Sequence, residues 1–295
     1  MNIAYKIMFF VSLLLIAAAT FVILVFGLRF GVDFKGGSVL EVDFVKERPA
    51  PAELTKIIGE ISGVKSVSVN PFAEQGMLVR MNEISEETHQ EVLKTVGQKY
   101  GQIIEKRFDS VGPTVGNELK KKSVTAIIIL LLAVAVYIAF VFRAMAKVLS
   151  PWALSVATII ALIHDVLVPI GVFALLGYYF GVEINGIFLA AVLTILGYSV
   201  SDSVVVFDRV RENVLRFGSR EEFGALVHRS VMQTLSRSLN TTFTTLLSLI
   251  AIYFFGGDSV KYFALALIIG IFLGAYSSIF IASPILVWWS GKPRN

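Results

Sequence analysis

Cysteine is absent from this chain of 295 residues, so no disulfide can join any two parts of it and no thiol can act as a nucleophile or a metal ligand. Charge is also scarce, since Asp, Glu, Lys and Arg make up 16% of the residues whereas 56% are hydrophobic. The mean hydropathy is +0.76. An ordinary soluble domain does not have this composition. The sequence therefore predicts a protein that spans a membrane several times.

The chain also lacks the motifs that many enzymes carry. It contains no Walker motif, and its segment between the first and second hydrophobic runs has no residues with metal-ligand or nucleophile spacing. The glycine-rich stretch GVDFKGG at 31–37 precedes a β pattern rather than a helix, so it does not fit a phosphate-binding loop. We therefore expect no enzymatic activity, no cofactor, no metal site and no nucleic-acid partner.

Six hydrophobic runs approach or exceed the roughly 20 residues that a helix needs to cross a bilayer. The first follows Lys6 and is longer than the apolar part of an ordinary secretory signal, so an uncleaved signal anchor is favoured over a cleaved signal peptide. The six runs predict a polytopic α-helical membrane protein. They lie at about 7–27, 123–142, 152–176, 187–207, 238–255 and 262–289.

The runs divide the chain into three predicted parts. Residues 1–28 hold the first membrane helix, 29–122 form an exported head, and 123–295 form a membrane domain of five helices. In the last helix Gly270 and Gly274 are four residues apart, a spacing that lets another helix approach closely. The serines that follow them, at 277 and 278, are interpreted as packing residues of the same kind.

The distribution of Lys and Arg among the short loops predicts the orientation. Arg143 and Lys147 lie between the second and third predicted helices, and the tail GKPRN is basic. The loop between the fourth and fifth helices carries a row of arginines. These are Arg209, Arg211, Arg216, Arg220, Arg229 and Arg237. We therefore expect both termini to be cytoplasmic and the head to be outside.

The head segment holds more than half of the charged residues of the chain. Its strand and helix signals alternate in the order β-α-β-β-α-β. That order is the ferredoxin-like arrangement, which hosts many unrelated functions. His89 is the only histidine of the segment and lies on an acidic, polar helix, so we expect it to be solvated.

Glycine-rich segments flank the head on both sides. Glycine permits positive φ angles and proline fixes φ. The segments therefore suit a pair of hinges that let the head swing, although two ordinary turns would have the same composition. The residues concerned are Gly31, Gly36 and Gly37 before the head, and Gly112, Pro113 and Gly116 after it.

Two carboxylates, Asp165 and Asp202, lie inside predicted membrane helices. A charged group there costs roughly 2.5 to 3.5 kcal/mol on insertion scales, so such groups normally face a bundle interior or a water-filled path. Ser199, Ser201 and Ser203 flank Asp202, and their hydroxyls can hold a water or share a proton. Asp202 is therefore a candidate proton or ion relay.

A polar face on the fifth predicted helix is expected to meet Asp202. Arg237 begins this helix and Thr241 lies one turn later on the same face. The three residues together form the candidate proton-coupling site. The alternative is a static ion pair that only holds the fourth and fifth helices together.

A second polar site lies near the centre of the third predicted helix. Adjacent side chains point about 100° apart around a helix, so His164 and Asp165 need not bond each other and each could find a separate partner. Both are candidates for the proton path. Charged residues also crowd the cytoplasmic end of the fourth helix, where Asp208 is expected to form a surface ion pair. These interface residues are Asp208, Arg209, Arg211 and Glu212.

Five segments together resemble one known family, the SecD/SecF family of the resistance-nodulation-division superfamily. They are GVDFKGG after the first helix, VGPTVG before the second, HD in the third, GYSVSDSVVVFDRVREN in the fourth and RSLNTT at the fifth. The resemblance spans the whole chain. DFKGG, FDRVREN and the single modest head favour the SecF branch over the larger SecD branch.

This resemblance implies an accessory subunit of the Sec protein translocase. Such a subunit would act with SecD beside the SecYEG channel, in the lipid of the bacterial inner membrane, with YajC and YidC as further candidate partners. It would use the proton-motive force to help export an unfolded preprotein. Asp202 would correspond to the proton-linked aspartate of the family, with Arg237 and Thr241 as its partners, and the head would move and contact the emerging chain.

Two functions of other kinds are alternatives. A passive membrane scaffold would bind SecD or substrate without ion flux, and its help to export would persist after the gradient is collapsed. An independent small-molecule exporter fits less well, because six helices and one small head provide only half of the usual pseudo-symmetric bundle. The sequence also leaves open whether sodium replaces protons.

Overall fold

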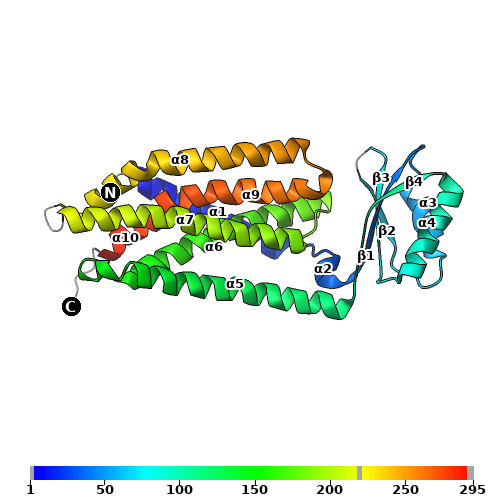
Figure 1. The fold of residues 1–295 in the computed structure, drawn as a ribbon, viewed down its shortest axis with the longest axis horizontal. Coiled ribbons are helices and arrows are strands. Elements are labelled where there is room, and N and C mark those ends of the chain that lie inside the picture. Colours follow the sequence, from blue (N-terminus) through cyan, green and yellow to red (C-terminus); the bar gives the residue numbers. More distant parts are fainter. Residues whose placement is uncertain (1–2, 73, 218–220, 291–295) are drawn as a thin grey trace. The chain divides into compact units, whose positions relative to one another are not determined.

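The computed structural model describes residues 3–72, 74–217 and 221–290, whose helices and strands are drawn in Figure 1. The chain forms two compact units, one made of Met1–Arg29 with Thr125–Asn295 and the other of Phe30–Val124. Arg220 and the basic tail at 291–295, which contributed to the predicted orientation, lie outside the described residues.

Among the described residues six helices are long and apolar enough to cross a membrane, as predicted. The sixth, over Val260–Ser290, consists of three consecutive helical segments. The elements are α1 (Ile3–Phe26), α5 (Pro113–Val141), α6 (Pro151–Phe180), α7 (Gly186–Phe217), α8 (Phe223–Phe255), α9 (Asp258–Ser277), the π-helical turn η3 (Ser278–Ala282) and α10 (Ser283–Ser290). A short 3-10 turn, η1 (Arg143–Lys147), precedes α6.

The predicted start of the fifth membrane helix at Ser238 is wrong, because α8 begins at Phe223. The added turns are amphipathic rather than uniformly apolar, so they escape a search for hydrophobic runs. Their apolar residues Leu226, Val227 and Val231 are buried in the core of the membrane unit. Arg237 consequently lies in the middle of this helix and not at its start.

The sixth span and α6 are the most enclosed helices of the membrane unit. In the most hydrophobic 18-residue stretch of each helix, the share of buried residues is 50% in α6 and 67% in the sixth span. It is only 11% in α1 and 6% in α5. The predicted close approach at Gly270 and Gly274 is confirmed, since a Cβ atom on Gly274 would lie 3.1 Å from Cβ of Ser199 on α7. The small residues thus allow α9 and α7 to pack closely at Ser199.

The head unit has the predicted order of elements, β-α-β-β-α-β. Its four strands form one sheet in the order β2-β3-β1-β4, with every neighbouring pair antiparallel. The core lies between this sheet and two helices and includes Leu40, Ile58 and Met77. The elements are β1 (Gly37–Phe44), α3 (Pro51–Gly59), β2 (Ser68–Phe72), β3 (Gly76–Met81), α4 (Glu86–Tyr100) and β4 (Ile103–Val111).

The expectation that His89 is solvated is wrong. Its side chain is buried on the same face of α4 as Val92 and Val96. The imidazole stacks on the Phe108 ring of β4 with the centroids 3.7 Å apart, and its Nδ1 lies 3.1 Å from Oε1 of Glu86. The acidic neighbours that suggested a solvated face instead hold the buried ring in place.

Candidate functional site

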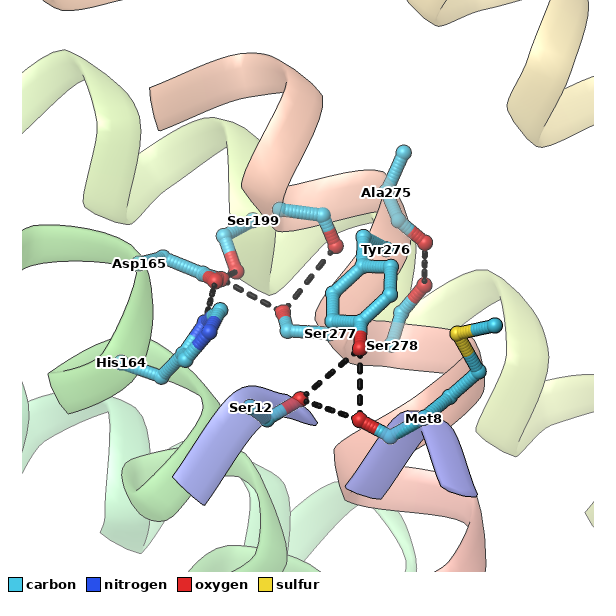
Figure 2. A network of polar contacts seen from close by, with 10 residues as sticks. Met8, Ser12, His164, Asp165, Ser199, Ala275, Tyr276, Ser277 and Ser278 are labelled. Atoms are coloured by element: carbon cyan, nitrogen blue, oxygen red, sulfur yellow. Dashed lines mark hydrogen bonds and ion pairs between the residues drawn. The ribbon is translucent and has the colours of Figure 1, made fainter. Parts of the chain in front are cut away.

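Asp165 lies at the centre of a polar cluster inside the membrane unit (Figure 2). Its carboxylate on α6 is completely buried. Oδ2 accepts hydrogen bonds from the hydroxyls of Ser199 on α7 and Ser277 on α9, each at 2.6 Å. Oδ1 lies 2.9 Å from Nδ1 of His164. His164 and Asp165 therefore contact each other although adjacent side chains need not, and Asp165 also has the separate partners Ser199 and Ser277.

Asp202 on α7 is held in the same way by hydroxyls from two other helical segments. Ser238 of α8 donates to Oδ1 and Ser278 of η3 donates to Oδ2, each at 2.5 Å. The residue is 8% exposed. Hydrogen bonds from hydroxyls to an ionised carboxylate are about twice as strong as those between neutral groups. Each aspartate is thus satisfied by serines, and Ser277 and Ser278, which contact one aspartate each, are adjacent in the chain.

The predicted meeting of Arg237 and Thr241 with Asp202 is not observed. Both side chains are exposed, and the Thr241 hydroxyl donates to the backbone oxygen of Arg237 at 2.9 Å. The residue of α8 that reaches Asp202 is Ser238, which lies about 100° further around the helix than Arg237. The expected polar pocket of flanking serines also differs, since Ser199 binds Asp165 instead.

Further buried polar atoms lie on the helices that carry these groups. His164 Nε2, Ser203 Oγ and Thr242 Oγ1 have no hydrogen-bond partner among the described residues. Ser203 follows Asp202 in the chain, and Thr242 lies one turn beyond Ser238 on α8. Buried hydroxyl and imidazole groups normally bind a protein group or a water. Each of the three atoms therefore has the chemistry to bind a water inside the membrane unit.

Tyr276 connects this cluster to α1. Its hydroxyl donates to the backbone oxygen of Met8 at 2.6 Å and accepts from the Ser12 hydroxyl at 3.1 Å (Figure 2). Its ring lies 6.1 Å from the imidazole of His164, at an angle of 29°. A second link joins α1 to α8, where the Tyr5 hydroxyl and Nδ1 of His228 are 2.9 Å apart.

The charged residues near the end of α7 form ion pairs between successive turns. Nη2 of Arg211 lies 2.7 Å from Oδ1 of Asp208, and Nη1 of Arg209 lies 2.5 Å from Oε2 of Glu212. Their side chains are between 35% and 56% exposed. The surface ion pair expected for Asp208 is confirmed, and these groups take no part in the buried cluster.

The two glycine-rich necks meet each other within the head unit. Gly36 has a φ of +79°, and a Cβ atom there would lie 2.6 Å from Cα of Pro113, the first residue of α5. A Cβ on Gly116 would lie 2.9 Å from the backbone nitrogen of Gly36. Gly37 has a φ of +119° and lies against the backbone of Met81. Only glycine fits such close backbone contacts.

The other two neck glycines have more local surroundings. Gly31 precedes a single helical turn, α2 (Val32–Lys35), so the first neck contains a turn of helix before its β pattern begins. Gly112 lies beside the carboxylate of Glu83. Among the described residues no group of three or more His, Cys, Asp or Glu side chains has the arrangement of a metal site.

Of the four serines that bind the carboxylates, the sequence singled out only Ser199, and it assigned that residue to Asp202 rather than to Asp165. Ser277 and Ser278 were interpreted as packing residues, and Ser238 was taken only as the start of a helix. Their spacing alone gives no register between helices, because a shift of one residue turns a side chain by about 100°. The signal that was available is the unusual pair of adjacent hydroxyls in an otherwise apolar helix.

Comparison with known proteins places these features in one family. The family described as "Protein export membrane protein SecD/SecF, C-terminal" matches residues 90–292, and the "SecD/SecF GG Motif" matches residues 21–47. A protein of Thermobaculum terrenum named "Protein translocase subunit SecF" is 43% identical, over 96% of this chain and 92% of its own length. One of the same name from Anaerolinea thermophila is 41% identical, over 97% of this chain and 93% of its own.

A solved structure has the same fold. The crystal structure of SecDF from Thermus thermophilus, described as a translocon-associated membrane protein, aligns with a TM-score of 0.82 and 33% identity. The alignment covers 98% of this chain and 38% of the SecDF chain, so this chain spans less than half of that longer protein. The family matches, the SecF relatives and the six helices long enough to cross a membrane agree. The chain therefore belongs to the SecD/SecF family of protein-export membrane proteins, on its SecF branch.

Proposed function

We propose that this protein is an accessory subunit of the Sec translocase that acts with SecD to promote protein export by using the proton-motive force. Its part in export is supported by the SecF and SecDF names of its relatives. Coupling to protons is supported by one observation above all: Asp165 and Asp202 are buried in the membrane unit, and serines from neighbouring helices bind both. Such groups in membrane helices are expensive and are typical of ion pathways.

In this proposal Asp202 exchanges the proton, and His164 with Asp165 forms a second station on the path. Arg237 and Thr241 act on Asp202 in another conformation, in which α8 rotates toward α7. A rotation of about 100° would exchange Ser238 for Arg237 beside the carboxylate. One proton crossing the membrane field releases about 2.3 kcal/mol per 100 mV, which is enough to shift an equilibrium between states that differ by a few kcal/mol.

SecD is the first partner that we propose. Fused SecDF relatives carry both parts in one chain, for example in Brucella abortus, where this chain covers 34% of the relative. A row of exposed polar residues along one face of α8 gives a physical reason for a partner. The threonine and serine hydroxyls of this row bond to the backbone of α8, but its arginine and asparagine side chains carry polar groups that lipid cannot satisfy. The row consists of Arg237, Asn240, Thr241, Thr244 and Ser248. Contacts with SecYEG, YajC, YidC and the emerging preprotein are further parts of the proposal.

We also propose that the protein lies in the bacterial inner membrane with both termini in the cytoplasm. The ion-paired residues Asp208, Arg209, Arg211 and Glu212 would then lie at the cytoplasmic interface. The exported head would be a ferredoxin-like module, a reading that its strand order supports. The necks at Gly36 and Pro113 would act as one hinge on which the head moves.

The decisive experiment measures head movement in a complex reconstituted with SecD. A label pair across the necks reports distance with and without a proton gradient, in the wild type, in Asp202→Asn and in Asp208→Asn. We expect a gradient-dependent distance change that Asp202→Asn abolishes and Asp208→Asn, an exposed aspartate on the same helix, retains. If neither the label distance nor the export rate depended on the proton gradient, the protein would be a passive scaffold instead.

A further inference from the structure

Three consecutive residues of the sixth span contact three different helices. Tyr276 bonds to α1, Ser277 to Asp165 on α6, and Ser278 to Asp202 on α7. Successive side chains on a helix point about 100° apart, so a helix enclosed by its neighbours can reach a separate one with each residue. In the described part of the membrane unit the buried aspartates and histidine are Asp165, Asp202 and His164. This short segment contacts all three.

Each of the two serines has a second acceptor within reach. The Ser278 hydroxyl lies 2.5 Å from Oδ2 of Asp202 and 3.0 Å from the backbone oxygen of Ala275. The Ser277 hydroxyl lies 2.6 Å from Oδ2 of Asp165 and 3.2 Å from the backbone oxygen of Gly274. A hydroxyl has one proton to donate. Each serine therefore donates its proton either to the carboxylate or to the backbone oxygen. Which acceptor is favoured depends on the charge of the carboxylate.

Protonation of the carboxylate reverses this choice without any net transfer between the residues. A neutral Asp202 carries an O–H that donates to Oγ of Ser278, and the serine proton then turns to the backbone oxygen of Ala275. Back-bonding of serine to the preceding turn bends a helix. The bend falls where α9 becomes the π-helical turn η3, in which the backbone N–H of Ser283 bonds to the oxygen of Ser278. Such turns are frequent at functional sites.

Tyr276 connects the same turn to α1. Its hydroxyl donates to the backbone oxygen of Met8 at 2.6 Å, and the Ser12 hydroxyl lies within reach of both, 3.1 Å from the tyrosine oxygen and 3.0 Å from the backbone oxygen. A turn that rotates at Ser277 and Ser278 must move Tyr276, because the three residues are adjacent. The chain of α1 continues into Phe30, the first residue of the head unit.

We propose that Tyr276, Ser277 and Ser278 form the coupling element of this protein. Ser277 and Ser278 are positioning residues that sense the protonation of Asp165 and Asp202, and Tyr276 passes the resulting movement to α1. The inference rests on the proposed function and names the residues that connect its proton site to the chain that leads to the head.

Infrared difference spectroscopy on the full chain tests the serines. The carboxyl C=O bands of Asp202 and Asp165 are identified by their loss in Asp202→Asn and Asp165→Asn. We expect Ser278→Ala to shift the Asp202 band to higher frequency and Ser277→Ala to shift the Asp165 band, because each change removes a hydrogen bond from one carboxyl. Unshifted bands in both variants would overturn the role of the serines, whether or not export uses the gradient.

Export assays on the complex with SecD test the tyrosine. Tyr276→Phe keeps the ring and removes the hydroxyl, so we expect both carboxyl bands to stay in place while the gradient-stimulated part of export falls roughly fivefold, the effect of one lost hydrogen bond. The gradient-independent part should not change, and Tyr137→Phe on the exposed face of α5 should match the wild type. If the gradient stimulated export equally in the wild type and in Tyr276→Phe, the role of Tyr276 in coupling would be refuted and the proposed function would stand. An unstimulated wild type would refute the proposed function itself.

Discussion

At the scale of single residues, carboxylates are tolerated in these membrane helices because hydroxyls from neighbouring helices satisfy them. The sequence identifies Asp165 and Asp202 without difficulty, since charge within an apolar run is conspicuous. It does not identify Ser238 or Ser278, because their role depends on the rotational phase of α8 and η3. The same uncertainty of phase placed Arg237 against Asp202, where the structure has Ser238.

A titratable group of the head leads to a prediction at this scale. Lys99 Nζ lies 3.1 Å from Oε1 of Glu53, and the hydrogen bond from Lys99 lowers the pKa of Glu53. Burial first, and then the nearby carboxylate of Glu53, raises the pKa of Tyr100 to about 12. A lowered carboxyl pKa adds stability above its unfolded value, and this is lost as the pH falls through the folded value. A raised phenol pKa adds stability that is lost as the pH rises toward 12.

We therefore expect Glu53→Gln to destabilise the head at neutral pH and to make little difference in acid, where the wild-type carboxyl is already protonated. Amide hydrogen exchange of α3 and α4 in the full chain, corrected for its intrinsic pH dependence, measures the effect. Glu91→Gln, an exposed change on α4, provides the control. If both variants responded to pH alike, the pair of Glu53 and Lys99 would have no part in stability.

At the scale of elements, close contacts between small residues determine which helices pack together. The spacing of Gly270 and Gly274 predicted one such contact correctly. The contact of α1 with α6 had no comparable signal, because Gly171 meets Ala19 rather than a second spaced glycine. A Cβ atom on Gly171 would lie 2.8 Å from Cα of Ala19. The length of α8 was missed for a different reason, since hydrophobicity alone does not reveal an amphipathic extension.

Gly171→Ala is expected to destabilise the membrane unit by about 1–3 kcal/mol, because the added methyl group must push α1 away from α6. Thermal unfolding in detergent measures the loss. Gly197→Ala on α7 is a matched control, since nothing lies within 4 Å of its added Cβ atom. There the change should be neutral or stabilising by about 0.5–1 kcal/mol. Equal stability of the two variants would refute the close approach of α1 and α6.

At the scale of the whole molecule, the sequence predicted both the number of spanning helices and the order of elements in the head. It could not predict which helix faces remain uncovered, because this depends on how the helices are arranged. The exposed polar row of α8, which includes Thr244, appears only once that arrangement is known. In the proposed complex with SecD, this uncovered polar face is where the partner would pack.

The lack of native cysteine allows a direct test of this surface, because a single introduced thiol is unique in the chain. A benzophenone attached at Thr244→Cys should cross-link to SecD in the assembled complex. The same reagent at Phe243→Cys, the adjacent exposed apolar position on α8, should cross-link much less, because it points about 100° away. Equal cross-linking from both positions would show that the polar row is not the contact.

The meeting of the two necks has a consequence for how this protein can be rebuilt. Since Gly36 and Pro113 touch, the chain enters and leaves the head at a single place. A domain whose ends are adjacent can be exchanged for another with adjacent ends, because the rest of the protein then has to bridge only a short distance between its two connecting segments. The head could thus be replaced by a foreign domain with neighbouring termini. The chain would still run from α1 through the inserted domain into α5.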